Sequence, residues 1–252
     1  ESRPETNDKC SPPGVRYGPS VIGSAGFIDT LPPELVVAAI PNVTNSCGGT
    51  STVTAAAGTS FISLNTNGTI PTGVTGCQVT VDVTSTTPGI YANTTGQVVG
   101  DTGAGNRASD TLIVMAPLVV GKSFATNPVA VNTPTVLTVS LTNPNSVPVS
   151  GATFTDSYPS GLVNTGTPAA ATTCGGSPAF TAAAAGSSLA VGGSGVTIPA
   201  NSSCAVSVNV LSAASGSYAN STGPVTTANA GASPAGIATL NVLTPPIVLT
   251  SF

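Results

Sequence analysis

The chain has 252 residues, of which only 6% are charged, and it contains neither His nor Trp. Without His, a Ser-His-Asp triad and His-based metal sites are excluded, and five basic against nine acidic residues leave no cationic stripe for nucleic acid. We therefore expect no enzyme, no cofactor and no nucleic-acid partner. The longest apolar run, residues 112–121, is interrupted by Pro117, so we also expect no membrane span.

Residues 1–25 are predicted to form a separate N-terminal arm. Six of the charged residues fall within the first sixteen positions, interspersed with prolines. Such a segment cannot supply an apolar pair of strands. The arm also holds Cys10, the odd cysteine of the chain, for which two interpretations stay open: a bond to another chain, or a free thiol buried under the arm.

From Phe27 onward the sequence repeats itself with an offset of 127 residues. Residues 27–32 (FIDTLP) return at 154–159 (FTDSYP), and residues 89–96 (GIYANTTG) return at 216–223 (GSYANSTG). A duplication of this length predicts two domains of about a hundred residues each. We assign residues 26–116 to the first and residues 117–243 to the second.

The cysteines follow the same repeat. Cys47 and Cys77 are separated by the same number of residues as Cys174 and Cys204, and Gly-Gly follows the first cysteine of each pair. This spacing favours one disulfide in each repeat over buried free thiols, and hence an oxidising compartment. We expect an extracellular or cell-surface location after removal of a signal peptide. Candidate glycosylation sites begin at Asn42, Asn67, Asn93, Asn201 and Asn220.

The hydropathy pattern is that of β-strands. Val206, Val208 and Val210 alternate with more polar residues, and turn sequences such as Asn143-Pro144-Asn145 separate short segments of this kind. No long amphipathic helical pattern is present. The prediction is an all-β protein with two tandem immunoglobulin-like antiparallel β-sandwiches, the first of which lacks its N-terminal strands.

The missing strands suggest a function. The second repeat uses residues 117–150 for two strands before it reaches Phe154, whereas the first repeat has only residues 1–26 in that place. The first sandwich should therefore have an open groove, and an unpaired strand edge tends to pair with another chain. Residues 244–252 resemble the missing sequence, because residues 245–252 align with residues 117–124. The candidate donor-strand residues are Pro245, Pro246, Ile247, Val248, Leu249 and Phe252.

Several segments together resemble a known group of modules. They are Lys-Ser-Phe at 122–124, residues 137–145, Phe-Thr-Asp at 154–156, the Cys-Gly-Gly sequences and the Gly-x-Tyr-x-Asn-x-Thr-Gly segment. These are similar to the conserved-repeat immunoglobulin-like modules of large bacterial surface proteins. The resemblance implies extracellular stalks with adhesive or structural roles, and it carries over no catalytic residue.

One cluster of residue types fits a different chemistry. Lys122, Asp156 and Asn241 are the three types that a spontaneous isopeptide bond requires, with the acid shuttling protons between the amine and the amide. The competing interpretation, a surface lysine, is the one that the sequence favours.

These observations lead to two alternative functions. The first is a structural subunit that assembles head to tail, each copy inserting residues 245–252 into the first sandwich of the next to build an extracellular filament. The second is a fragment of a tandem stalk from a bacterial surface adhesin. The expected partner is the chain itself, with surface glycans as further candidate ligands.

Overall fold

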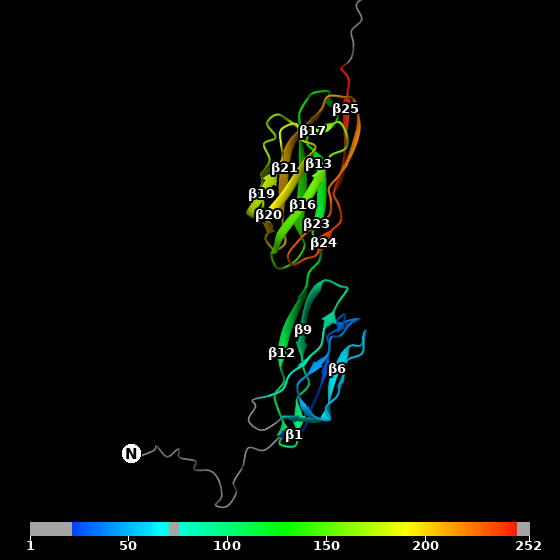
Figure 1. The fold of residues 1–252 in the computed structure, drawn as a ribbon, viewed down its shortest axis with the longest axis vertical. Coiled ribbons are helices and arrows are strands. Elements are labelled where there is room, and N and C mark those ends of the chain that lie inside the picture. Colours follow the sequence, from blue (N-terminus) through cyan, green and yellow to red (C-terminus); the bar gives the residue numbers. More distant parts are fainter. Residues whose placement is uncertain (1–21, 71–75, 246–252) are drawn as a thin grey trace, which may run out of the picture. The chain divides into compact units, whose positions relative to one another are not determined.

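The computed structural model describes residues 22–70 and 76–245, and the regular elements in these ranges are all β-strands (Figure 1). In these ranges no helix of the length and apolarity needed to cross a bilayer is found. The chain divides into two compact units between Val114 and Met115, two residues before the predicted boundary. Each unit is a β-sandwich, so the protein is all-β with two tandem domains.

Within residues 22–70 and 76–114, the first domain contains twelve strands, most of them short, in one large sheet and three small pairs. The large sheet has the order β11-β10-β1-β6-β4, with β5 also paired to β6; the pairs are β9 with β12, β2 with β8 and β3 with β7. The strands are β1 (Ile22–Thr30), β2 (Val36–Val37), β3 (Thr44–Asn45), β4 (Gly48–Gly49), β5 (Val53–Thr54), β6 (Phe61–Ile70), β7 (Val79–Thr80), β8 (Val83–Thr84), β9 (Gly89–Thr94), β10 (Val99–Gly100), β11 (Gly103–Ala104) and β12 (Ser109–Val114).

In residues 115–245 the second domain contains three sheets, with orders β13-β15-β21-β17, β14-β25-β22 and β19-β20-β16-β23-β24. One pair departs from the predicted antiparallel arrangement, because β14 runs parallel to β25. The strands are β13 (Val119–Phe124), β14 (Val129–Ala130), β15 (Thr135–Asn143), β16 (Val149–Ser157), β17 (Leu162–Asn164), β18 (Ala171–Thr172), β19 (Gly175–Thr181), β20 (Ser188–Ile198), β21 (Ser202–Ser212), β22 (Gly216–Ser221), β23 (Val225–Thr226), β24 (Ala232–Ser233) and β25 (Ile237–Leu243).

The two domains share strand pairing as well as sequence. β1 pairs with β6 as β16 pairs with β20, and the register Phe27 to Leu64 returns as Phe154 to Val191. The antiparallel pair of β9 and β12 corresponds to that of β22 and β25. β7 and β8 together correspond to β21. The duplication is therefore preserved at the level of backbone hydrogen bonding.

The first strand starts earlier than the predicted arm allows. β1 begins at Ile22, inside the segment assigned to the arm, and Ile22 pairs with Ile70. The corresponding strand β16 begins at Val149, which pairs with Ile198. Both pairings contain two register shifts at the same repeat positions. The apolar residue that opens each strand is thus part of the fold, and the predicted end of the arm at residue 25 is too late.

One disulfide lies in each domain, between Cys47 and Cys77 and between Cys174 and Cys204. Each closes a loop with a sequence separation of 30 residues. In the chain-entropy account, a loop of this length stabilises a domain by about 3 to 4 kcal/mol. In the first domain the bond joins the residue before β4 to a residue shortly before β7. In the second domain it joins the residue before β19 to a residue within β21.

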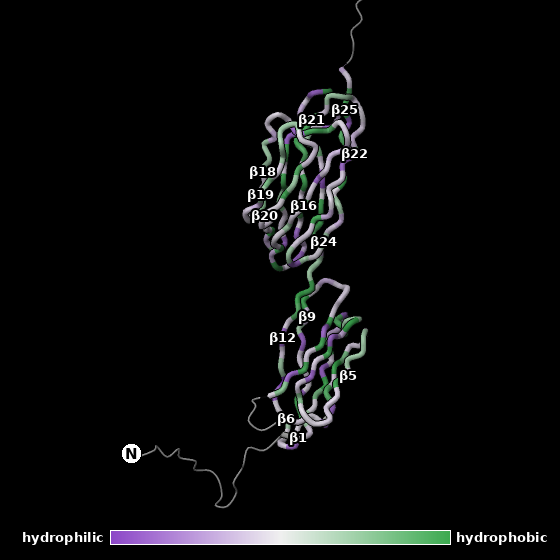
Figure 2. Tube along the Cα trace, in the orientation of Figure 1, coloured by the Kyte–Doolittle hydropathy of each residue, from purple (hydrophilic) through white to green (hydrophobic). Residues whose placement is uncertain are grey.

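The two cores differ greatly in size. Among the described residues, twenty-three buried residues form the core cluster of the second domain, against five in the first: Leu31, Leu35, Val37, Ile62 and Tyr91. In the second domain β15 alone contributes Leu137, Val139 and Leu141, each with 0% exposure. Figure 2 shows hydrophobic (green) and hydrophilic (purple) stretches along the strands of both domains. Within residues 22–70 and 76–114, the first domain thus buries fewer apolar side chains in its core than the second domain does.

Candidate functional site: the open groove of the first domain

The repeated sequence Gly-x-Tyr-x-Asn-x-Thr-Gly organises one side of each sandwich. The hydroxyl of Tyr91 donates to the carbonyl oxygen of Thr87, and that of Tyr218 donates to Ala214, with O···O distances of 2.6 and 2.8 Å. These two bonds fasten the strand β9 or β22 to the turn that precedes it. The tyrosine of the motif therefore has a structural role in both domains.

The last glycine of this motif lies against the first strand of the large sheet. The amide of Gly96 donates to Ile28, and that of Gly223 donates to Thr155, with N···O distances of 2.8 and 2.7 Å. A Cβ atom at Gly96 would overlap the carbonyl oxygen of Ile28, and one at Gly223 would lie 3.0 Å from that of Thr155. Glycine is required because the two backbones approach so closely.

Three strands of the second domain have no counterpart in residues 22–70 and 76–114. They are β13, β14 and β15, which precede β16 in the chain. β15 lies between β13 and β21 and pairs with both. In the described part of the first domain, the edge corresponding to β21 is therefore unpaired on the side that β15 covers in the second.

Three valines on this edge show the consequence directly. Val206, Val208 and Val210 of β21 are at most 1% exposed, because they lie opposite Val139, Leu137 and Thr135 of β15. Their repeat counterparts Val79, Val81 and Val83 are all partly exposed. The opposite strand of the sandwich behaves likewise: Leu112, opposite Tyr91, is 38% exposed, whereas Leu240, opposite Tyr218, is 0% exposed.

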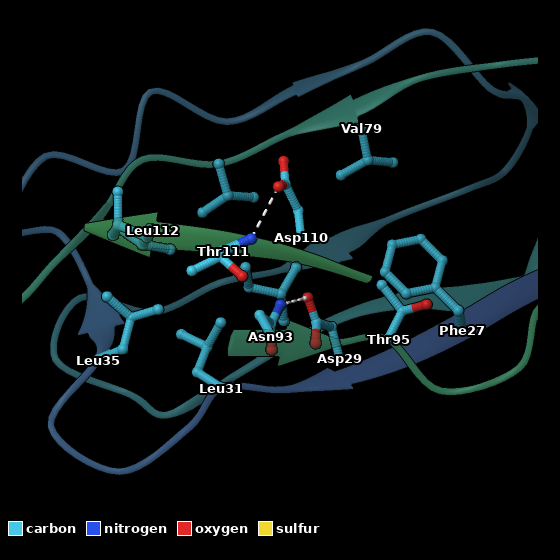
Figure 3. Close-up of a pocket in the computed structure, with 13 residues that line it drawn as sticks. Phe27, Asp29, Leu31, Leu35, Val79, Asn93, Thr95, Asp110, Thr111 and Leu112 are labelled. Carbon is cyan, nitrogen blue, oxygen red and sulfur yellow. Dashed lines mark hydrogen bonds between the residues drawn. The ribbon is translucent and has the colours of Figure 1, made fainter. Parts of the chain in front are cut away.

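The uncovered residues line a cavity of about 390 Å³, open to solvent (Figure 3). The walls are mainly apolar, and the lining residues include Leu31, Leu35, Ile62, Leu112 and the three valines. We call this cavity the groove. The sequence prediction of an open groove in the first sandwich agrees with these exposures, and the physical reason is the lack of covering strands among the described residues.

A polar pair lies inside the groove. The carboxamide of Asn93 donates from Nδ2 to Oδ2 of Asp29 with an N···O distance of 2.8 Å, and Figure 3 shows the two side chains pointing toward each other. Asp29 is 7% exposed. Oδ1 of each residue is buried and accepts no hydrogen bond within the described chain. Besides apolar surface, the groove therefore holds two buried acceptor atoms that have no hydrogen-bond partner among the described residues.

The structure distributes the other predicted site residues unevenly. Pro245 is exposed, while the donor-strand residues Pro246, Ile247, Val248, Leu249 and Phe252 lie outside the described residues, as does Cys10. Of the candidate glycosylation sites, Asn42, Asn67 and Asn201 are exposed. Asn93 and Asn220 correct the prediction: each is held by a buried aspartate, and a glycan on Nδ2 would have to replace that bond.

The geometry also identifies features that the sequence analysis missed. β13, the sequence relative of residues 245–252, pairs with β15 and not with β21. In the second domain, the place equivalent to the groove is therefore covered by β15 as well as by β13. The sequence analysis also missed the Asp29–Asn93 pair. A signal for this pair was present in the sequence, since both residues recur 127 positions later as Asp156 and Asn220.

Comparisons with solved structures find similar β domains at low identity. The C-terminal domain of the Streptococcus agalactiae AgI/II polypeptide BspA has 12% identity and a TM-score of 0.43, with 88% of this chain and 85% of that chain covered. The C-terminal domain of the Streptococcus pyogenes antigen I/II-family protein AspA has 12% identity and a TM-score of 0.41, with 88% and 85% covered. The collagen binding domain of Erysipelothrix rhusiopathiae surface protein RspB has 14% identity and a TM-score of 0.34, with 87% and 82% covered.

Similarity at the level of sequence families is more direct. No curated protein matches the sequence of this chain. One family model, described as a domain of unknown function, matches residues 20–114 and again residues 118–242. The two matched segments coincide with the two sandwiches, and together they cover most of the chain. The chain therefore belongs to the DUF7933 family, whose domain it contains twice.

Proposed function

We propose that this chain is a structural subunit of an extracellular filament, in which residues 245–252 of one copy fill the groove of the next. The observation that carries the proposal is the exposure of Val79, Val81 and Val83, whose counterparts in the second domain are covered by β15. The role is architectural, and no catalytic step is assigned to any residue.

The backbone available for pairing determines where the donated strand lies. Asp82 already exchanges hydrogen bonds with Pro41 and Ala38 on one side of its segment. The other side is the one that β15 occupies against β21 in the second domain. We therefore place the donated strand on this open edge, in the position of β15, and not in the position of β13 that sequence alignment alone indicates.

The energy of such a contact comes from both layers of the sandwich. Burying four large apolar side chains of the tail contributes roughly 6 to 12 kcal/mol, against an association cost of about 4 to 15 kcal/mol. Backbone pairing and cover for Leu112 and the valines add to the favourable side. Because the groove lies in the first domain and the donor at the C-terminal end, the contact is head to tail and can propagate.

A matched pair of substitutions tests the proposal. Leu112 lines the groove and Ile113 does not, although the two are 38% and 43% exposed on the same strand. Glutamate at either position should be tolerated by the monomer. We expect the full chain and its Ile113→Glu variant to form fibres under electron microscopy, and the Leu112→Glu variant and a chain ending at Leu243 to remain monomeric on sizing.

The same experiment contains the result that overturns the proposal. The full chain, both glutamate variants and the shortened chain could all prove monodisperse with equal thermal stability. Residues 245–252 would then not fill the groove of another copy. The second candidate function, a piece of a tandem stalk of a bacterial surface adhesin, would then be favoured. The observation in favour of that alternative is the twofold match to one family of domains, since tandem copies of a module are the usual construction of a stalk.

A further inference from the structure

The interior of the second domain holds a cluster of one amine, one acid and one carboxamide, contributed by three strands. Lys122 lies on β13, Asp156 on β16 and Asn220 on β22. Nζ of Lys122 is 2.7 Å from Oδ2 of Asp156, and Nδ2 of Asn220 donates to the same oxygen with an N···O distance of 3.3 Å. One carboxylate oxygen thus contacts both nitrogens.

The three side chains are removed from solvent. The side chains of Lys122 and Asp156 have 0% exposure, and Asn220 is 1% exposed. The predicted surface lysine is therefore wrong, because β13 packs with Lys122 facing the interior, where its Cβ lies close to Gly236. The predicted amide partner Asn241 is also wrong. It is exposed between the buried residues Leu240 and Val242, and its backbone amide donates to Asn127.

The cluster is poorly satisfied as a set of non-covalent contacts. Apart from the ion pair, Nζ of Lys122 has no hydrogen-bond partner within the described chain, and neither does Oδ1 of Asp156 or Oδ1 of Asn220. Leaving buried polar atoms unpaired is costly, and a buried ion pair recovers little of the cost of removing two charges from water. A reaction that converts the amine into a neutral amide would remove a buried charge and so lower this cost.

The environment favours the uncharged form of the amine. Desolvation by burial lowers the pKa of Lys122, although contact with Asp156 acts in the opposite direction. Transfer of a proton from Nζ to Asp156 gives two neutral groups, which a buried apolar site accommodates more easily than two charges. A neutral amine has the free electron pair that attack on a carbonyl carbon requires.

We propose that Lys122 and Asn220 form an intramolecular isopeptide bond, with Asp156 as the group that moves the proton. Nζ attacks Cγ of Asn220, a new N–C bond forms, and the carbonyl electron pair moves to Oδ1. A proton passes from Nζ through Asp156 to Nδ2. The Cγ–Nδ2 bond then breaks, the carbonyl re-forms and ammonia leaves. The amine and carboxamide become one secondary amide plus ammonia, so no oxidant or reductant is needed.

The first domain provides an internal comparison. Asp29 and Asn93 occupy the repeat positions of Asp156 and Asn220 and make the equivalent contact. The described residues of the first domain include no lysine, so this pair lacks an amine there. The first domain therefore has the acid and the carboxamide without the amine. We expect the reaction only in the second domain, where Lys122 of β13 supplies the amine.

The test uses the full chain, reduced and denatured after purification. Formation of the bond lowers the intact mass by one ammonia relative to the sequence. A succinimide at Asn67-Gly68 would give the same mass, so digestion by trypsin is the deciding measurement. Acylated Lys122 is not cleaved, and the expected product is one peptide spanning residues 108–252. Release of separate peptides 108–122 and 123–252, together with an unchanged mass, would overturn the proposal and leave a buried ion pair only.

Variants identify the atoms involved. The variants Lys122→Arg, Asn220→Ala and Asp156→Asn should each have the full mass calculated from their sequence. Asn241→Ala should be lighter than its calculated mass by one ammonia, as the wild-type chain is. Asp156→Asn keeps Lys122 cleavable by trypsin, which separates the role of the acid from that of the amine. The wild-type measurement stands on its own, so the proposal remains testable even if one of these variants fails to fold.

Discussion

Replacing equivalent valines by alanine in the two domains should have unequal effects if the groove is open. Val81 and Val208 occupy the same repeat position, but Val208 is 1% exposed opposite Leu137, whereas Val81 is partly exposed beside the groove. At about 0.8 kcal/mol per buried methylene, plus a term for the cavity left behind, Val208→Ala should cost about 2 kcal/mol. Val81→Ala in a monomer should cost less than about 1 kcal/mol, because solvent already reaches the site.

Calorimetry on the chain ending at Leu243 measures this difference. For a domain the size of the second one, 1 kcal/mol shifts the melting temperature by roughly 4 °C, so Val208→Ala should lower one transition by about 8 °C. Hydrogen exchange assigns each transition to its domain. In filaments of the full chain, Val81→Ala should become nearly as costly as Val208→Ala. Equal costs in the shortened monomer would refute the reasoning, because they would mean that the groove is already filled.

Three further outcomes follow from the structure. Replacing Cys47 and Cys77 by serine should unfold the first domain, whose core cluster has five buried residues, while the same change at Cys174 and Cys204 should lower the melting temperature of the second domain and leave it folded; circular dichroism and calorimetry measure both. Gly96→Ala should destabilise the first domain by about 1 to 3 kcal/mol in denaturant titration, because its methyl group would overlap Ile28, and an unchanged midpoint would contradict the close approach. Burial, reinforced by the charge of Asp156, raises the pKa of Tyr158 above its usual 10.0. Above about pH 10 the unfolded chain therefore releases a proton that the folded domain retains, and the free energy of unfolding should fall as the pH rises. In Tyr158→Phe this decline should be smaller.

Much of the architecture could be predicted because it depends on local patterns. Strand alternation, the repeat and the cysteine spacing are all properties of neighbouring or evenly offset residues, and they led to two β-sandwiches with an incomplete first member. The signal for the interior carboxamide was also local. Asn220 lies two residues after Tyr218, on the same buried face of β22, while Asn241 falls between Leu240 and Val242 and must point outward.

What the sequence by itself determined was the duplication, the all-β class and the shortage of strands in the first repeat, because each is encoded in periodicity along the chain. The tertiary structure alone decided which side chains meet. That Lys122 on β13 meets Asp156 on β16, and that β15 and not β13 covers β21, depends on pairing and packing between strands that are far apart in sequence. Those pairings result from the packing of whole sheets, so no spacing of residues along one strand could have predicted them.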